Sequence, residues 1–496
     1  MGFALFAFME AQDQLGTVLC QRRFWQGSSL LMLLNRGMRK SSRRWTPEGA
    51  SAKKTRMHPQ YTRRSFLKAT LASSLAAPFF VRNLISAPPS RKVIHASFGA
   101  GGMARSDLTA ITSHPDVIFA AVADVEPGKA DDLKKKWPEL RVYQDWRQLL
   151  EKEKELTSVN VSTPDHMHAP IAMRAMNRGL HVYGQKPLTH DLYETRRLTE
   201  VARKKKLVTQ MGIQIHSNAE YRLAVQLVQE GAIGKIKEVH TWSNKTWGDL
   251  TAKPDRVDPV PPGFDWDLWL GVCATRPFIG KGYYHPGNWR KRLDFGTGTF
   301  GDMGCHIYDP VFGALALTAP ISVRSEGAAP NEHSWATDAL IQYVFPGTRY
   351  TEGKQVKVTW YDGIKRPPQE VLAQVGPKIP DQGSIFLGTK GIMVLPHIAK
   401  PILLPVENYT DYKQPEVKGA NHWHQFVEAI QGKGIASANF DYSGPLTEAV
   451  LLGSVATRFP EQTLDWNAKK LKFTNISAAN KYVRRRYRKG WEVSGL

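Results

Sequence analysis

The chain has 496 residues, of which 42% are hydrophobic and 23% charged, so it has an ordinary globular composition and is too long for one typical core. Basic residues exceed acidic ones by 22, but residues 1–92 contain 16 basic and only 3 acidic residues. The remaining 404 residues have 51 basic and 42 acidic residues, without the basic stripe that is typical of nucleic-acid-binding proteins. We therefore expect two or more domains and no nucleic-acid partner.

The N-terminal region reads as an export signal. Tyr61-Thr-Arg-Arg-Ser-Phe-Leu-Lys68 contains a twin arginine and precedes a short apolar stretch of small residues that ends near Val81. This order predicts a Tat signal, with cleavage near Ala77 or Ala87 and a periplasmic or secreted product. A basic amphipathic helix is the alternative. Because a signal normally lies close to the start, we interpret Met57 as the start of translation; the mature chain has no stretch apolar enough to span a membrane.

The mature chain opens with a strand, a glycine-rich turn, a helix and a second strand. The strand 92–98 leads into Gly99-Ala100-Gly101-Gly102-Met103-Ala104, a helix follows over 105–113, and the strand 117–123 ends at Asp124. This order predicts a Rossmann βαβ unit that binds a dinucleotide. Gly99 permits a tight turn, Gly101 lets the backbone approach a pyrophosphate, and the helix N-terminus stabilises the phosphates. A carboxylate at Asp124 accepts hydrogen bonds from the ribose hydroxyls and repels a 2′-phosphate, which favours NAD over NADP.

Strands and helices continue to alternate up to about residue 205. We expect helices over 127–136, 146–153, 169–178 and 190–205, and strands over 140–143, 158–163 and 181–184. This alternation predicts a parallel sheet with helices on both faces. Thr163, Pro164, His168, Gln185 and Lys186 follow strand ends, where ligands bind in such sheets. We expect these five residues, together with the glycine-rich turn, to contact the cofactor.

From about residue 207 the pattern changes to that of a sheet-rich domain. A helix over 220–230 precedes an alternating strand over 237–243, and further strands are expected over 320–326, 338–345, 355–361, 384–387 and 392–395. The lack of helices between these strands predicts a mostly antiparallel sheet. Proline-rich stretches at 253–263 and 366–380 predict long surface loops. The basic run 484–489 is interpreted as a solvated helix face, with an anionic contact site as the alternative.

The residues that best suit catalysis follow a second glycine-rich segment. Asp302 and His306 are four positions apart, which places them on one face of a helix and allows the carboxylate to orient a proton-accepting imidazole. A capping aspartate and a structural histidine are the alternative. Lys186 follows a strand of the predicted nucleotide domain, and burial beside a cationic nicotinamide favours loss of its proton. A plain surface lysine is the alternative.

Other motifs are less specific. An aromatic and basic cluster before Asp302 suits a polyol, so we count Tyr283, His285, Trp289 and Arg290, together with Asp309, as candidate substrate residues; a packed loop is the alternative. His166 and His168 lack further ligands at metal-binding spacing, so no metal is expected. The three cysteines Cys20, Cys273 and Cys305 exclude a disulfide scaffold, and a bridge between the last two is not expected.

Taken together, these motifs resemble the Gfo/Idh/MocA oxidoreductases. The resemblance rests on Gly99–Ala104, Thr163-Pro164 with His168, Gln185-Lys186-Pro187 and Asp302-x-x-x-His306, spans about 92–496, and includes a tail over 485–491 similar to that of exported members from planctomycete-like bacteria. It implies a Rossmann domain over 92–210 and an α/β domain over 211–496 with an open, mostly antiparallel sheet and a C-terminal helical tail. It also implies NAD as cofactor, sugar or inositol substrates, and action of Lys186, Asp302 and His306 at the reacting carbinol.

Two departures from the family pattern concern the substrate and the proton relay. The usual Glu-Lys-Pro is Gln185-Lys186-Pro187 here, which removes a carboxylate beside the lysine, and the usual Asn-Arg-Arg is Gln214-Ile215-His216. We predict hydride transfer between a polyol hydroxyl and NAD, with His306 and Lys186 handling the hydroxyl proton. The alternatives are a redox-neutral glycosidase or lyase that uses bound NAD, and a non-catalytic sugar sensor. By analogy with the family we expect a homo-oligomer.

Overall fold

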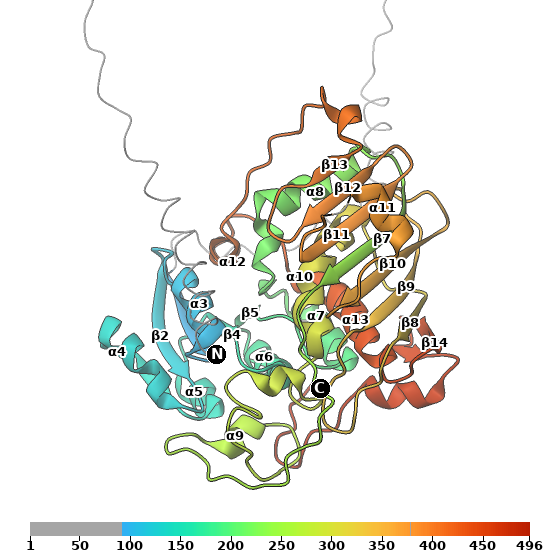
Figure 1. Ribbon diagram of the computed structural model, residues 1–496. Coiled ribbons are helices and arrows are strands. Elements are labelled where there is room, and N and C mark those ends of the chain that lie inside the picture. Colours follow the sequence, from blue (N-terminus) through green and yellow to red (C-terminus); the bar gives the residue numbers. More distant parts are fainter. Residues whose placement is uncertain (1–91, 377) are drawn as a thin grey trace, which may run out of the picture. The chain divides into compact units, whose positions relative to one another are not determined.

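Figure 1 shows the computed structural model, which describes residues 92–376 and 378–496. The twin-arginine segment 61–81, Met57 and Cys20 lie outside the described residues, so the export signal stays a prediction. Within the described ranges, every helix is too short or too polar to cross a bilayer. The same ranges contain no cluster of histidine, cysteine and acidic side chains suited to a metal ion.

The first half of the described chain forms a six-stranded parallel sheet. Its strand order is β3-β2-β1-β4-β5-β6, which is the doubly wound order of dinucleotide-binding domains. The elements in chain order are β1 Val93–Phe98, α3 Gly102–Ile111, β2 Val117–Ala123, α4 Asp131–Lys136, β3 Arg141–Tyr143, α5 Trp146–Lys152, β4 Ser158–Val161, α6 His168–Asn177, β5 His181–Gly184, α7 Leu192–Lys205 and β6 Thr209–Met211. The predicted parallel Rossmann sheet is confirmed.

The second sheet has nine strands in the order β13-β12-β11-β7-β10-β9-β8-β14-β15. Only β7 and β10 are parallel neighbours, so the prediction of a mostly antiparallel sheet is confirmed. Its strands are β7 Ile236–Ser243, β8 Ser322–Glu326, β9 Leu340–Pro346, β10 Gln355–Asp362, β11 Gln382–Gly388, β12 Ile392–Pro396, β13 Ile402–Leu404, β14 Thr463–Asn467 and β15 Lys472–Phe473. Alternating burial along β9 fits a strand with one face in the core.

Three long helices build the core beside this sheet. They are α8 Ala219–Gln229, α10 Gly298–Leu315 and α13 Phe440–Ala456, and α10 packs against both of the others. The ring of Phe300 on α10 lies 4.8 Å from that of Trp360 on β10, between ring centroids. Because α10 is buried along almost its whole length, the side chains that it carries are held by packing on all sides. The short helix α9, Trp266–Leu270, belongs to the long connection between β7 and α10.

Two expectations about local structure are wrong. The proline-rich stretch 366–380 was expected to be a loop, but it contains helix α11, Gln369–Val375, whose Val371 packs with Trp242 on the sheet. Pro368 occupies the N-cap position of this helix, where the missing N–H of a proline costs nothing. The C-terminal tail is not helical: after the short 3₁₀ turn Ser477–Tyr482, the run 484–489 is irregular. Hydrogen bonds from that run to other parts of the chain take the place of helical hydrogen bonds.

The parallel sheet is partly covered by a helix from far along the sequence. Helix α12, His422–Ile430, packs against α3, and Figure 1 shows these two helices close together. Adjacent residues of β5 point to opposite faces: Val182 lies in the main core, whereas Tyr183 packs with Phe426 of α12. A segment that lies between strands β13 and β14 of the second sheet therefore completes the nucleotide-binding half.

Candidate functional site

The turn between β1 and α3 requires glycine at its first position. Gly99 has a φ of +101°, and a Cβ there would lie 2.8 Å from the carbonyl oxygen of Ser162 and 2.9 Å from Cβ of Ala104. The small Ala104, only 1% exposed, is what lets helix and strand approach so closely. This is the tight turn that the motif predicts.

The start of helix α3 is open to a ligand. No side chain caps its N-terminus, whereas Asp191 caps α7 through the backbone N–H of Glu194. At Gly102 a Cβ would meet nothing within 4 Å, and at Gly101 it would meet only the flexible stem of Lys129 at 3.6 Å. The N–H groups of the first helical turn therefore face free space, which suits the pyrophosphate of a dinucleotide.

Asp124 is held in place by two backbone groups. Its carboxylate accepts hydrogen bonds from the N–H of Ala100, at 2.8 Å, and from that of Glu126, at 2.9 Å. Ala100 is fully buried and thus contributes to the site by orienting this acid. Burial raises the pKa of Asp124, while these two hydrogen bonds oppose the rise. Each oxygen retains a free lone pair, so the residue fits recognition of ribose hydroxyls.

A cavity of about 330 Å³ joins this turn to the segment that contains Asp302. It brings together most of the residues that the sequence singles out: Gly99, Gly101, Gly102, Met103, Asp124, Thr163, Pro164, His168, Gln185, Lys186, His285, Trp289, Arg290 and Asp302. These residues come from the ends of β1, β2, β4 and β5 and the segments that follow them, from the loop before α10 and from α10 itself, as expected for a ligand at the carboxyl edge of a parallel sheet. The cavity is therefore a suitable place for NAD.

Lys186 and Asp302 form an ion pair at one end of the cavity. The ammonium Nζ donates to Oδ1 and to the backbone oxygen of Asp302, both at 2.8 Å, and the side chains are 14% and 16% exposed. Arg290 adds a second cation, 3.3 Å from the same Oδ1. Burial alone would raise the pKa of Asp302, but Lys186 and Arg290 outweigh it and hold the pKa below its ordinary value. Asp302 is thus ionised at neutral pH.

His306 lies one turn beyond Asp302 on α10 and is 7% exposed. Burial, with a smaller contribution from the charge of Lys186, lowers its pKa well below the ordinary value, so the imidazole is neutral at neutral pH; His306 is not among the residues that line the cavity. Within the part of the chain that the structure describes, its Nδ1 has no hydrogen-bond partner. The expected pairing with Asp302 is not formed, because that carboxylate is bound to Lys186 and Arg290 instead.

Gln185 contacts a carboxylate on helix α3 and none on its own segment. Its Nε2 donates to Oδ2 of Asp107 at 2.8 Å, and its Oε1 accepts from the N–H of Lys186 at 3.2 Å. Asp107 also accepts hydrogen bonds from Ser162 and, through its other oxygen, from Trp423. Burial raises the pKa of Asp107 to about 6 despite these hydrogen bonds. The carboxylate missing at position 185 is therefore present in the same neighbourhood, on another element.

The two histidines of the H-x-H motif are structural in their contacts. His168 places its ring nitrogens 2.8 Å from the carbonyl oxygen of Pro187 and 2.7 Å from that of Thr163, which fixes both loops at the cavity wall. His166 contacts the carbonyl oxygen of Trp269, and burial lowers its pKa to about 3. Nδ1 of His166 has no partner, but within the described residues neither ring belongs to a group of three histidine, cysteine or acidic side chains that could hold a metal ion.

Only some of the candidate substrate residues line the cavity. His285, Trp289 and Arg290 line the cavity, with His285 held by Glu126 at 2.5 Å. Tyr283 lies against the guanidinium of Arg292, 3.7 Å from the ring centroid to Cζ, and does not line the cavity. Asp309 is 2% exposed and is bound to His216 and Tyr442, at 2.8 and 2.6 Å, so it lies outside the cavity lining.

Some residues of the site were missed by sequence reasoning. Asp165 is buried at the cavity wall and accepts a hydrogen bond from Thr297 at 2.7 Å, and Asp107 lies behind Gln185. Asp107 lies on the buried face of α3 together with Leu108 and Ile111. An acidic residue on a buried helix face is the sequence signal that could have identified it. No local pattern pointed to Trp269, which reaches the cavity from α9.

The fold and the cavity define a two-domain protein with a dinucleotide site at the edge of its parallel sheet. Residues 95–213 match the family model described as an oxidoreductase family with an NAD-binding Rossmann fold, and residues 226–493 match the model of its C-terminal alpha/beta domain. The chain belongs to the Gfo/Idh/MocA oxidoreductase family. Its cofactor is NAD, and the turn, the uncapped helix and Asp124 fit that molecule.

Curated relatives are distant. Levoglucosan dehydrogenase of Pseudarthrobacter phenanthrenivorans is 22% identical over 219 residues, which is 42% of this chain and 48% of the relative. The dTDP-3,4-didehydro-2,6-dideoxy-alpha-D-glucose 3-reductase of Streptomyces antibioticus is 26% identical over 50% of this chain and 73% of the relative. Myo-inositol 2-dehydrogenase of Thermotoga maritima is 23% identical over 30% and 41%. The chain thus spans about half the length of the first of these relatives.

Solved structures share the fold. The WlbA dehydrogenase from Bordetella pertussis, in complex with NADH and UDP-GlcNAcA, has a TM-score of 0.55 at 15% identity and covers 76% of this chain and 98% of its own. GenD2 from gentamicin A biosynthesis, in complex with NAD, has a TM-score of 0.53 at 17% identity over 78% and 100%. At these identities the similarity shows the architecture alone.

Proposed function

We propose that this protein is an NAD-dependent dehydrogenase that acts on a hydroxyl group of a sugar or an inositol-like polyol. Bound NAD supplies the hydride acceptor for such a reaction. The names of the relatives that act on levoglucosan, dideoxyglucose derivatives and inositol support a polyol substrate. The aromatic and cationic side chains of Trp289 and Arg290 at the cavity suit the apolar face and the hydroxyls of a sugar.

The observation that carries the proposal is the arrangement of Lys186, Asp302 and His306. Lys186 reaches the cavity from the end of β5 and is anchored by Asp302 of α10, so a donor of fixed position faces the cofactor cavity. One turn further on α10, the neutral imidazole of His306 accepts the proton of a substrate hydroxyl as the hydride leaves its carbon. Lys186 donates a hydrogen bond to that oxygen and stabilises the charge that develops on it.

The test is single-turnover reduction of bound NAD by a panel of sugars and inositols, followed by absorbance of the reduced nicotinamide. Lys186→Met and His306→Gln should each slow reduction by at least about 10²-fold, the usual contribution of an acid–base group. The surface variants Lys205→Met and His333→Gln serve as controls and should react at the wild-type rate. Unchanged rates in Lys186→Met and His306→Gln would refute the assignment of the site.

The same experiment separates the alternatives. A net dehydrogenase releases reduced cofactor in proportion to the substrate consumed. A redox-neutral glycosidase or lyase consumes substrate with no net reduced cofactor, and a sensor binds the sugar without consuming it. Quantifying product and reduced nicotinamide together therefore tests the proposed net oxidation directly.

We further propose export through the Tat system, on the basis of the twin arginine Arg63-Arg64 and the apolar stretch that follows it. Replacing both arginines with lysine should retain the protein in the cytoplasm, as measured by cell fractionation. Wild-type protein found only in the cytoplasm would contradict the proposal.

The protein is further proposed to form a homo-oligomer, by analogy with open-sheet members of its family. Light scattering of the purified protein during size-exclusion chromatography tests this point. A mass equal to one chain would refute it.

A further inference from the structure

A second cavity, separate from the cofactor cavity, lies beneath the C-terminal segment. Its volume is about 410 Å³, within the range of small-molecule sites. It is lined by residues of α13, of the loops before α7 and α10, and of the chain beyond β15. Five cationic side chains face it: Arg276, Arg458, Lys481, Arg485 and Arg486. Only three acids do so: Asp191, Asp294 and Glu332.

The acids do not neutralise all of these cations. Arg276 is paired with Asp294 at 2.5 Å, and the backbone N–H of Arg485 donates to Asp191 at 3.0 Å. Glu332 is 93% exposed at its side chain and lies within ion-pair distance of His333. Among the described residues, Arg458, Lys481 and Arg486 have no carboxylate within ion-pair distance. Positive charge therefore remains uncompensated in the cavity.

Arg458 is the most unusual of the three. Its guanidinium lies over two aromatic rings, 4.9 Å from the ring centroid of Trp335 and 4.4 Å from that of Tyr482. Burial lowers the pKa of Arg458, while Tyr482 and the charge of Asp294 oppose this shift. The rings hold the planar group in one orientation, so little conformational entropy is lost when it binds a planar or tetrahedral oxyanion.

Buried polar atoms at the same cavity also lack partners. Ser454, in the last turn of the helix α13 that precedes Arg458, is 6% exposed, and its hydroxyl has no hydrogen-bond partner within the described ranges. The same holds for Nη1 of Arg485 and Nε2 of His190. Such groups cost free energy unless something binds them. Trp335, Leu451 and Val455 supply apolar wall for the carbon skeleton of a ligand.

We propose that this cavity binds the oxyanion group, phosphate or carboxylate, of a small organic anion, with Arg458 as its principal ligand. The anionic contact site considered for the run 484–489 agrees with this, because Arg485 and Arg486 belong to both. The site goes beyond the dehydrogenase function and does not depend on it.

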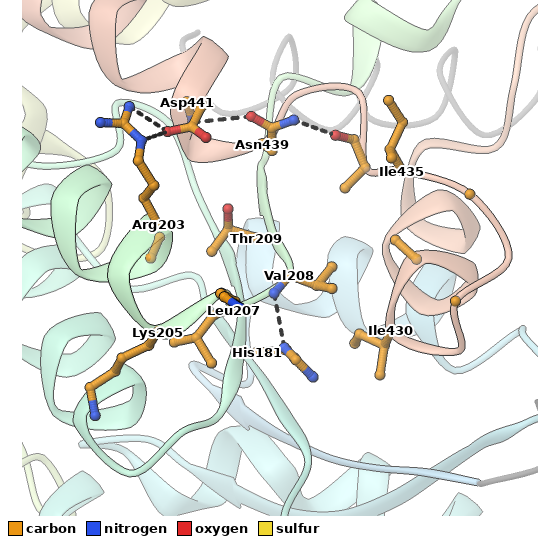
Figure 2. Close-up of a pocket in the computed structure, with 16 residues that line it drawn as sticks. His181, Arg203, Lys205, Leu207, Val208, Thr209, Ile430, Ile435, Asn439 and Asp441 are labelled. Atoms are coloured by element: carbon orange, nitrogen blue, oxygen red, sulfur yellow. Dashed lines mark hydrogen bonds and ion pairs between the residues drawn. The ribbon is translucent and has the colours of Figure 1, made fainter. Parts of the chain in front are cut away.

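The hollow in Figure 2 provides a contrast and a control. It has a volume of about 270 Å³ and also holds cations, of which Arg203 and Lys205 are engaged. Arg203 donates two hydrogen bonds to Asp441, at 2.7 and 3.0 Å, and Lys205 donates to the carbonyl oxygen of Asn177 at 2.9 Å. Arg203 thus offers a matched arginine whose charge is already compensated.

The test is calorimetric titration of the full-length protein with inorganic phosphate and, separately, with citrate, at constant ionic strength and saturating NAD. Saturating NAD blocks phosphate from the dinucleotide site. Wild-type protein should bind at least one of the two anions saturably, and the stronger one indicates which oxyanion the site prefers. Arg458→Met should weaken that binding at least tenfold, whereas Arg203→Met should leave it unchanged.

Two results would overturn the proposal: no saturable binding of either anion, or equal binding by wild type and Arg458→Met. Equal binding would place the anion elsewhere, for example beside Lys186 and Arg290. If Arg458→Met does not fold, the double surface variant Lys481→Gln/Arg486→Gln replaces it. This variant should weaken binding at least threefold, and unchanged affinity would refute the site.

Discussion

Lys186 and Asp302 are 116 residues apart in the chain, yet Nζ of the lysine lies 2.8 Å from Oδ1 of the aspartate. The strand β5 brings one partner to the cavity and the helix α10 brings the other, so the pair ties the nucleotide-binding sheet to the second half of the protein. Arg290 contacts the same oxygen at 3.3 Å. A single carboxylate therefore orients two cations at the site.

This relationship predicts the effect of Asp302→Asn. The amide keeps the shape and its oxygen can still accept hydrogen bonds, but it leaves two cations without a counter-charge, so Lys186 is held less firmly. Reduction of bound NAD should slow by at least about 10²-fold, with little change in NAD affinity. Stopped-flow absorbance and a binding titration measure the two effects. Asp441→Asn, a surface carboxylate paired with Arg203, serves as the control, and equal rates in both variants would contradict the prediction.

Gly101→Ala tests where the pyrophosphate binds. The new methyl group would lie 3.6 Å from the stem of Lys129, in ordinary contact, so the fold should tolerate it. It would nevertheless project where the backbone meets the cofactor. We expect NAD affinity to fall at least tenfold while the melting temperature changes by only a few degrees. Gly128→Ala, whose methyl group would lie 3.9 Å from Asp131, is the control and should bind NAD normally.

Asp124→Asn tests the choice between the two dinucleotides. Removing the negative charge abolishes its repulsion of a 2′-phosphate, and it weakens the hydrogen bonds to the ribose hydroxyls. The ratio of NADP affinity to NAD affinity should rise at least tenfold. Titration of the variant with each dinucleotide gives the ratio, and a ratio equal to that of wild type would show that Asp124 does not face the ribose.

Gln185→Glu restores the residue that is common in the family but places a second carboxylate 2.8 Å from Asp107. Burial already raises the pKa of Asp107 to about 6, so its ionisation costs stability as pH rises toward that value. A neighbouring carboxylate raises the pKa further, and each unit corresponds to about 1.4 kcal/mol. The variant should therefore lose more stability at pH 8 than at pH 5, as measured by denaturant unfolding. A loss independent of pH would contradict this account.

We expect the buried His95 to make part of the free energy of unfolding depend on pH. Its ring lies in the sheet, 2.9 Å from Oγ of Ser158 and 3.0 Å from Oδ1 of Asn160, and burial lowers its pKa to about 4. The unfolded chain binds a proton near pH 6.5, so stability present above that pH is lost as pH falls toward 4, by about 3 kcal/mol. His95→Gln should remove this dependence. Denaturant unfolding at pH 7 and pH 4 gives the free energy of unfolding of wild type and variant at each pH. An equal loss between the two pH values in both proteins would exclude a contribution from the titration of His95.

Local patterns predicted the elements that can be read within a short stretch of chain. The buried runs of β1 and β2, the turn at Gly99 and the acid at Asp124 lie within 32 residues, and the spacing alone specifies how they meet. The parallel sheet and the mostly antiparallel sheet follow from whether helices separate the strands. Wrong expectations arose where tertiary contacts replaced local signals. The tail beyond Tyr482 is irregular because Arg485 bonds to Asp191, Cys273 and Asp294 rather than to its own helix.

The sequence by itself determined the Rossmann turn, the acid at the end of β2, and the identity of the lysine, aspartate and histidine proposed for catalysis, because these depend on spacing within single βα or helical units. Only the tertiary structure decided that Asp302 binds Lys186 rather than His306, that Asp107 lies behind Gln185, and that Asp309 is turned away from the cavity. These contacts join residues up to several hundred positions apart, such as Asp107 and Trp423. Their geometry depends on how the two sheets and α10 pack together, and no local spacing encodes that packing.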